Sequence, residues 1–282
     1  MNSNLNINIR SIDAFKSISE KAIKYIENEC NLLNYRIGQP ISKNNTIPDQ
    51  ILIVLSGEAR LLYGTHVRSS TITKLKSDSF IGLASTLKVN GCELVSASSE
   101  VLAMSLSDKL ILKLYKEESS FRDWCNTNIQ TSEILSIAVQ LNKEIAKSKL
   151  KLNDLIDILK LNTQLIIINN GERIKTDDDY IYIIGSSNIV NREIGETLEQ
   201  NELIQSSGPL PVRIYKLSKN TYNKINTVSD KNSSRKDEQS NSINLKNKEV
   251  IQEERFLGET TQNVGQYQVK KEFKLIKANG LM

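Results

Sequence analysis

The sequence has few of the residues that build catalytic and metal sites. Its 282 residues include three cysteines and a single histidine, His66, in a polar stretch. No Cys–His or Ser–His nucleophile pair can be read from this pattern. Cys30, Cys92 and Cys125 are odd in number and lack metal-ligand spacing, which favours ordinary reduced thiols in the cytoplasm. We therefore expect no enzyme activity of its own, no catalytic residue, no metal and no cofactor.

The sequence also lacks a large charge excess and a long apolar run. Its 37 basic and 33 acidic residues give a formal net charge of +4. Such a balance offers no bulk attraction to nucleic acid or to an anionic membrane. No apolar run reaches the roughly 18 residues that a membrane-spanning helix needs, and the N-terminus lacks the apolar core of a secretory signal. We expect a cytoplasmic chain with no membrane span and no nucleic acid partner.

Short apolar runs separated by turns make up the block from residue 35 to residue 106. These runs lie at residues 51–55 (ILIVL), 71–75 (TITKL), 93–97 (ELVSA) and 101–106 (VLAMSL). No helix-length segment stands between one run and the next, so antiparallel strands fit better than alternating strand–helix units. The pattern predicts a mainly β fold with flanking helices (α+β), in the form of a sandwich or roll.

Helical periodicity flanks this block on both sides. Residues 12–33 carry apolar positions, Leu32 included, at helical spacing among charges, which predicts one or two amphipathic helices. Beyond Ser107 the pattern turns helical again and forms one apolar face. That face predicts packing either inside the chain or against a second copy in a homodimer. Its apolar positions are Ile134, Ile137, Leu141 and Ile145.

A second block has spacing like the first, which predicts a shortened tandem repeat. Residues 171–174 (GERI) correspond to residues 38–41 (GQPI), and residues 180–184 (YIYII) correspond to residues 51–55. From about Thr227 onward, charged and small polar residues without apolar periodicity predict a disordered linker. The predicted organisation is a first domain at 1–147, a second, shortened roll at 148–224, a linker at 225–266 and a C-terminal tail at 267–282.

The first block resembles a known family. Residues 52–59 (LIVLSGEA), residues 77–87 (SDSFIGLASTL) and the strand after them are similar to the cyclic nucleotide-binding domain, the eight-stranded roll of catabolite activator proteins and kinase regulatory subunits. The resemblance covers roughly residues 11–142, with a degenerate second copy at about 150–223. It implies a double-stranded β-helix, or jelly roll, of the cyclic nucleotide-binding type.

Residues 80–97 (FIGLASTLKVNGCELVSA) match the phosphate cassette of that family in part. In the family, backbone amides of a short helix and one arginine hold the cyclic phosphate, and a glutamate accepts the ribose hydroxyl. Gly82 matches the cassette glycine, but Leu83 replaces the glutamate and no arginine stands near residues 90–93, where Glu93 would repel a phosphate. The resemblance therefore implies a roll that does not bind cyclic nucleotide in the usual way. The degenerate cassette residues are Phe80, Gly82, Leu83, Ala84, Cys92 and Glu93.

A second cassette-like stretch, residues 194–198 (IGETL) with Arg213 downstream, is interpreted as a chance match. Gly195 follows the turn at residues 184–185 too closely to open a cassette. Arg213 falls on the strand that corresponds to residues 103–104 of the first block.

Functions of two classes remain open. Tandem degenerate rolls before a polar linker resemble the N-terminal region of cyanobacterial peptidase-containing ABC exporters, and residues 273–282 are similar to the lead-in to their peptidase. This resemblance implies a non-catalytic regulatory or docking module that partners exporter subunits or domains and lies peripheral to the inner membrane through the transporter. The alternatives are a cyclic nucleotide (cAMP or cGMP) sensor and a catabolite-activator-like transcription regulator without its DNA-binding domain.

Overall fold

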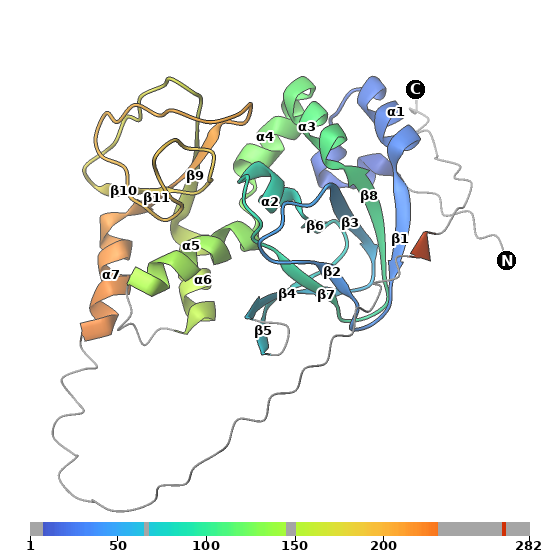
Figure 1. Cartoon of the computed structure of the whole chain (residues 1–282), viewed down its shortest axis with the longest axis horizontal. Helices are drawn as coiled ribbons and strands as arrows, with labels where there is room; N and C mark the ends of the chain where they lie inside the picture. Colours follow the sequence, from blue (N-terminus) through green and yellow to red (C-terminus); the bar gives the residue numbers. More distant parts are fainter. Residues whose placement is uncertain (1–7, 65–67, 145–150, 231–266, 269–282) are drawn as a thin grey trace, which may run out of the picture.

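Two antiparallel sheets enclose the core of the larger part of the molecule (Figure 1). The computed structural model describes residues 8–64, 68–144, 151–230 and 267–268. One sheet has the strand order β12-β1-β8-β3-β6 and the other β2-β7-β4-β5. Apart from β12, these orders are those of an eight-stranded jelly roll, so the predicted fold class is confirmed. The strands are β1 (Asn31–Tyr35), β2 (Pro40–Ser42), β3 (Gln50–Ser56), β4 (Ala59–Gly64), β5 (Ser69–Leu75), β6 (Phe80–Ile81), β7 (Leu94–Ala97), β8 (Val101–Ser107) and β12 (Tyr267–Gln268).

Strand β3 shows why a continuous apolar run forms a strand here. Ile51 and Ile53 face a cluster under the N-terminal and C-terminal helices of the roll, whereas Leu52 and Val54 face the core between the sheets. Successive side chains of a strand point to opposite faces. A strand covered on both faces therefore needs apolar residues at every position.

Helices cover one end of the roll. They comprise two short 3-10 turns (Ile9–Ser11 and Asp13–Phe15), α1 (Glu20–Glu29), α2 (Leu83–Leu87), α3 (Asp108–Glu117) and α4 (Ser119–Thr127). The helix predicted over residues 12–33 ends earlier than expected, at Glu29. Leu32 lies in β1 rather than on a helix face, because Leu32 and Leu33 fill opposite faces of the sheet opposite Met104 and Ala103.

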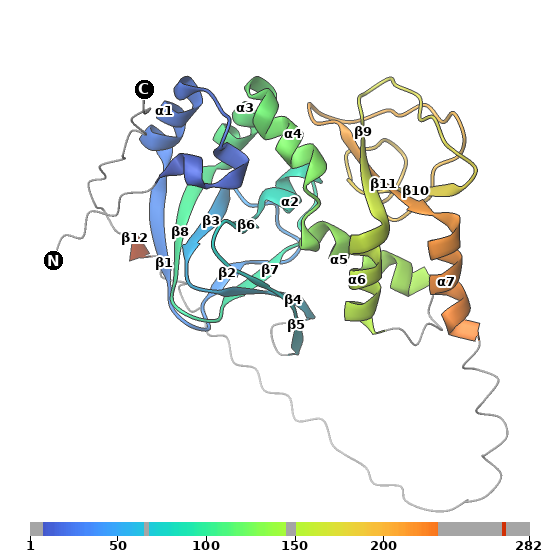
Figure 2. The ribbon, with the colours of Figure 1, turned by 180° about the vertical axis from the view of Figure 1, so that it is seen from behind.

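A smaller unit follows the roll. It contains a three-stranded sheet of order β10-β11-β9 and the helix α7, and α5 and α6 lie between it and the roll (Figure 2). The bounds are α5 (Thr131–Glu144), α6 (Leu152–Asn162), β9 (Thr163–Ile168), β10 (Tyr180–Ile184), β11 (Val212–Ser218) and α7 (Lys219–Asp230). Helix α7 continues past the boundary expected at residue 224.

The smaller sheet and one sheet of the roll share local features. In both, the first strand pairs with the last, and the last pairs with the strand that follows a long loop. In both, a serine at the end of the last strand accepts from a backbone amide of the following helix, Ser107 from Leu110 and Ser218 from Thr221.

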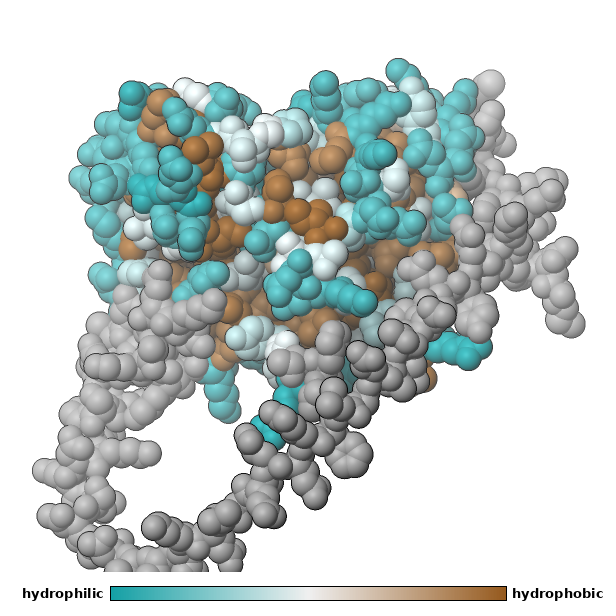
Figure 3. Space-filling model, in the orientation of Figure 1, coloured by the Kyte–Doolittle hydropathy of each residue, from teal (hydrophilic) through white to brown (hydrophobic). Residues whose placement is uncertain are grey.

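The apolar face of α5 packs inside the chain. Ile134, Ile137 and Leu141 are buried in one cluster with Ile183 and Leu217 of the smaller sheet. On the face seen in Figure 1, apolar residues gather near the middle, between the smaller unit and the roll (Figure 3). The apolar face of α5 therefore packs inside the chain, and the homodimer stays a prediction.

Some expectations lie outside the described residues. His66, Ile145, the chain from 231 to 266 and the tail beyond 268 belong to this group. Within the described part of the chain, no helix is both long and apolar enough to cross a bilayer. The same residues contain no group of three or more His, Cys, Asp or Glu side chains placed to hold a metal ion.

Candidate functional site

The cassette stretch folds as a short strand, a turn, a short helix and a return loop. Between β6 and α2, Gly82 has a φ of 94°, in the left-handed region that favours glycine. A Cβ atom on Gly82 would lie 2.8 Å from Cγ of Pro48. Leu83 and Ala84 of α2 are completely buried, so Leu83 is a core side chain here. Phe80 packs at 5.1 Å from the ring of Trp124.

The carboxylate of Glu93 lies on the first turn of α2. The side chain is 3% exposed, and its Oε2 atom accepts hydrogen bonds from the backbone N (3.2 Å) and Oγ (2.8 Å) of Ser85. Its Oε1 atom accepts a long hydrogen bond of 3.4 Å from Ser132 Oγ on α5. The sequence indicated only a repelling charge near the cassette, whereas the structure places that charge on the cassette amides.

Burial shapes the ionisation of this group and its neighbours. Burial raises the pKa of the Glu93 carboxyl, and the hydrogen bonds from Ser85 together with the backbone amide of Gly82 oppose the rise. Burial lowers the pKa of Lys88, whose Nζ has no hydrogen-bond partner among the described residues. The pKa of Cys92 is raised to about 12 by burial, which keeps this thiol protonated and unreactive at neutral pH.

We expect Glu93→Gln to change how stability depends on pH. Because the pKa of Glu93 is raised above its ordinary value of 4.5 in the folded state, its favourable contribution is complete below that pH and is lost as pH rises through the folded pKa. Glutamine cannot ionise, so the free energy of unfolding of the variant should increase relative to that of the wild type as the pH rises. The gain is about 1.4 kcal/mol for each unit by which the pKa is raised.

Urea unfolding of both proteins between about pH 4 and pH 8 measures this difference. Lys88 and Cys92 are present in both, so the difference between the curves reports chiefly on Glu93. A difference that stays constant over this range would contradict an ionisable, buried Glu93.

Glu93 lies between two cavities. The sheet cavity has a volume of about 300 Å³ and the hinge cavity about 230 Å³. The sheet cavity is lined by Tyr35, Pro40, Ile41, Ser42, Lys43, Thr46, Pro48, Asp49, Gln50, Leu52, Ile81, Gly82, Ser85 and Glu93. The hinge cavity is lined by Leu61, Leu75, Asp78, Ser79, Phe80, Glu93, Trp124, Asn128, Ile129, Gln130, Thr131 and Ser132.

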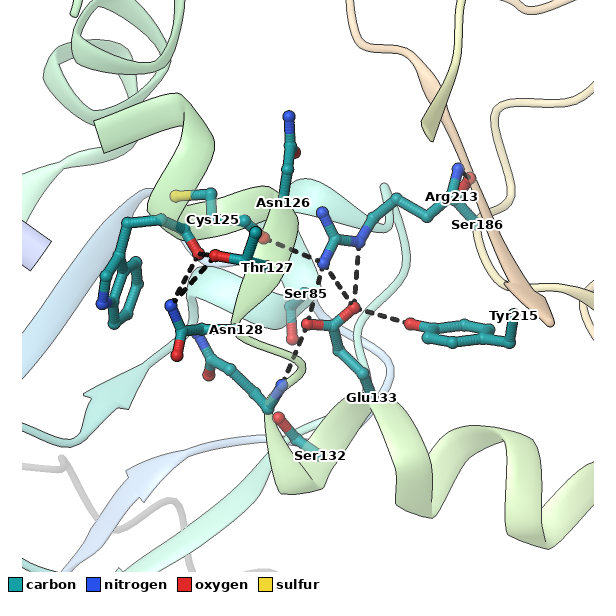
Figure 4. Close-up of polar contacts among 12 residues, drawn as sticks. Ser85, Cys125, Asn126, Thr127, Asn128, Ser132, Glu133, Ser186, Arg213 and Tyr215 are labelled. Atoms are coloured by element: carbon teal, nitrogen blue, oxygen red, sulfur yellow. Dashed lines mark hydrogen bonds and ion pairs between the residues drawn. The ribbon is translucent and has the colours of Figure 1, made fainter. Parts of the chain in front are cut away.

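A buried ion pair joins α5 to the smaller sheet (Figure 4). Arg213 of β11 donates from Nε to Oε2 of Glu133 (2.9 Å) and from Nη2 to Oε1 (3.1 Å). The hydroxyl of Tyr215 donates to Oε2 at 2.6 Å. Glu133 and Tyr215 are completely buried and Arg213 is 1% exposed. We call these three residues the interunit clasp.

The clasp also contacts the end of α4. Arg213 Nη2 donates to the carbonyl oxygen of Cys125 at 3.2 Å, and Oε1 of Glu133 accepts from the amide of Gln130 at 3.2 Å. Arg213 lies on the strand where the sequence placed it, but its partner was missed. The available signal was that Glu133 precedes the apolar run of α5 directly and that Arg213 lies between apolar residues at the start of β11.

The return loop after α2 touches the smaller unit directly. The amide of Ser187 donates to the carbonyl oxygen of Lys88 at 2.9 Å, and Ser187 Oγ donates to the carbonyl oxygen of Val89. Val89 has a φ of 52°, a conformation that β-branched residues rarely adopt. The smaller unit therefore contacts the chain just after the C-terminal end of α2, while Glu93 binds the first turn of α2.

The second cassette-like stretch has a structural role. Gly195 has a φ of 100°, and a Cβ atom there would lie 2.8 Å from Cβ of Gln140 on α5. No helix begins at Gly195 in the described structure. Close approach to α5 accounts for this glycine.

No family model and no curated protein matches the sequence. Solved structures that are similar include the regulatory domain of Toxoplasma gondii PKA with cAMP, at a TM-score of 0.38 and 11% identity over 80% of this chain and 92% of that chain. A putative cyclic nucleotide-binding protein from Geobacter metallireducens has a TM-score of 0.36 and 18% identity over 40% and 83% of the two chains. The N-terminal domain of a transcriptional regulator from Streptomyces coelicolor has a TM-score of 0.34 and 14% identity over 48% and 91%. These TM-scores are low, so the similarities carry no argument about ligand or partner.

Proposed function

We propose that the chain is a non-catalytic regulatory or docking module whose jelly roll holds its own carboxylate where a cyclic nucleotide-binding domain holds a phosphate. The supporting observation is the carboxylate of Glu93 on the amide and hydroxyl of Ser85. A nucleotide phosphate would have to displace Glu93 from these donors and would then lie beside a second negative charge. Both steps oppose binding, because the buried donors are already satisfied and like charges repel.

Thermal unfolding with cAMP or cGMP tests this proposal. A ligand at 100 times its dissociation constant stabilises its protein by about 2.7 kcal/mol. We expect neither nucleotide to raise the midpoint of unfolding of the wild-type protein. The proposal fails if either gives a saturable rise that Ser85→Ala weakens, while Ser69→Ala, at an exposed serine of β5, leaves it unchanged.

We also propose that the smaller unit is a shortened second roll and that the partner is an ABC-type exporter. The matching strand order and the equivalent serine caps support the repeat. The exporter rests on the sequence resemblance alone. Co-purification with exporter subunits, retained by Glu93→Gln, would support a docking role that is separate from any ligand.

A further inference from the structure

The hinge cavity combines carboxylates with aromatic rings. Asp78 is exposed, Glu93 lies deep, and the rings of Phe80 and Trp124 are 5.1 Å apart. Serine, threonine and amide side chains from residues 128–132 complete the wall, and Figure 4 shows Asn128 and Ser132 at the junction of α4 and α5. None of the described residues that line this cavity is Lys, Arg or His.

Glu93 has hydrogen-bonding capacity left on the side of this cavity. Oε2 accepts two hydrogen bonds from Ser85, which lines the sheet cavity. Among the described residues, the one hydrogen bond whose geometry places it on Oε1 is the 3.4 Å bond from Ser132, which lines the hinge cavity. An ionised carboxylate offers about four acceptor positions, about two on each oxygen. Oε1 therefore keeps an acceptor position without a donor among the described residues, although Glu93 is only 3% exposed.

The neighbouring bases do not supply the missing donor. Lys88 Nζ has no hydrogen-bond partner among the described residues. The guanidinium of Arg213 is engaged by Glu133 and by the carbonyl oxygen of Cys125. A positively charged donor that entered the hinge cavity would therefore meet an acceptor with no competing cation bonded to it.

We propose that the hinge cavity binds a small organic cation of the amine or ammonium class. Its charged nitrogen would approach Oε1 of Glu93, and its carbon skeleton would lie against Phe80 and Trp124. Aromatic faces attract such cations in addition to burying their apolar parts, and Asp78 at the surface adds attraction to the approaching charge. The volume of about 230 Å³ limits the ligand to a small molecule. This site lies beyond the proposed function, which requires no ligand.

Trp124 gives the proposal a direct readout. It is the single tryptophan of the chain and lines the cavity, so tryptophan fluorescence reports on the surroundings of this one side chain. We expect 2-phenylethylamine, protonated at neutral pH, to change the fluorescence saturably, and calorimetric titration to give the same dissociation constant. Its neutral analogue 2-phenylethanol should bind at least tenfold more weakly, because it has the same ring and lacks the charge.

Variants test the role of each carboxylate. Glu93→Gln should weaken binding of 2-phenylethylamine at least tenfold, and Asp78→Asn, at an exposed position that does not endanger folding, should weaken it several-fold. Asp154→Asn on α6 is the matched control and should have no effect. Equal binding of the amine and the alcohol, unchanged binding in both carboxylate variants, or the absence of a saturable signal at millimolar amine would overturn the proposal.

Discussion

Replacing Glu133 with alanine is expected to destabilise the protein by about 3–5 kcal/mol, the usual effect of removing one partner of a buried ion pair. The variant leaves the guanidinium of Arg213, 1% exposed, without its counter-charge. It also removes the acceptor of the Tyr215 hydroxyl and of the Gln130 amide. Urea unfolding monitored by circular dichroism measures the loss.

Two comparisons separate the interunit clasp from an ordinary loss of charge. The double variant Glu133→Leu with Arg213→Met removes both charges and should recover the part of the loss that comes from the unpaired guanidinium, while the loss from the Tyr215 hydroxyl and the Gln130 amide stays. Glu20→Ala breaks the ion pair of Arg10 and Glu20, whose side chains are 30% and 81% exposed, and should cost at most about 1 kcal/mol. If Glu133→Ala were no more harmful than Glu20→Ala, the clasp would contribute no more than a surface pair.

Gly185→Ala should damage the same region by a steric route. A Cβ atom at this position would lie 2.0 Å from Cε2 of Tyr215 and 2.9 Å from the carbonyl oxygen of Arg213. The ring of Tyr215 must move, and its 2.6 Å hydrogen bond to Glu133 is then lost. We expect the free energy of unfolding to fall by about 1–3 kcal/mol through overpacking and by about 1–3 kcal/mol more through the unsatisfied buried groups.

Gly208→Ala is the control for backbone strain. Gly208 has a φ of 96°, and no atom of the described residues lies within 4 Å of a Cβ atom there. This variant should cost about 1–2 kcal/mol, the usual penalty of the left-handed conformation. Because Gly185 needs no left-handed φ, a larger loss for Gly185→Ala can be assigned to the displaced tyrosine. If Gly185→Ala lowered the free energy of unfolding less than Gly208→Ala does, the interunit clasp would accommodate the methyl group at little cost, contrary to this prediction.

Local sequence patterns predicted the roll well, because strands and amphipathic helices follow from hydrophobic periodicity. The run at residues 51–55 became β3, covered on both faces, and the glycine at position 82 opened α2. Leu32 was misplaced on a helix because an apolar residue near a helix end fits either period.

The candidate site depended on contacts that a single sequence does not reveal. Glu133 and Arg213 are 80 positions apart, and nothing in the sequence near either residue shows that the two form an ion pair. The sequence shows that Glu93 is acidic, but the position of its carboxylate on the first turn of α2 depends on how the return loop turns. That turn requires glycine at position 91, because a Cβ atom there would lie 2.1 Å from the amide nitrogen of Thr46.

The unusual backbone at Val89 makes the cassette dependent on its neighbour. A left-handed β-branched residue carries an intrinsic cost of about 1–3 kcal/mol, and such a conformation persists only when surrounding contacts impose it. Those contacts include the hydrogen bonds from Ser187 to the carbonyl oxygens of Lys88 and Val89. Detachment of the smaller unit would release this stored energy into the loop that carries Glu93. A partner that pulled the two units apart would thereby change the cassette without touching it.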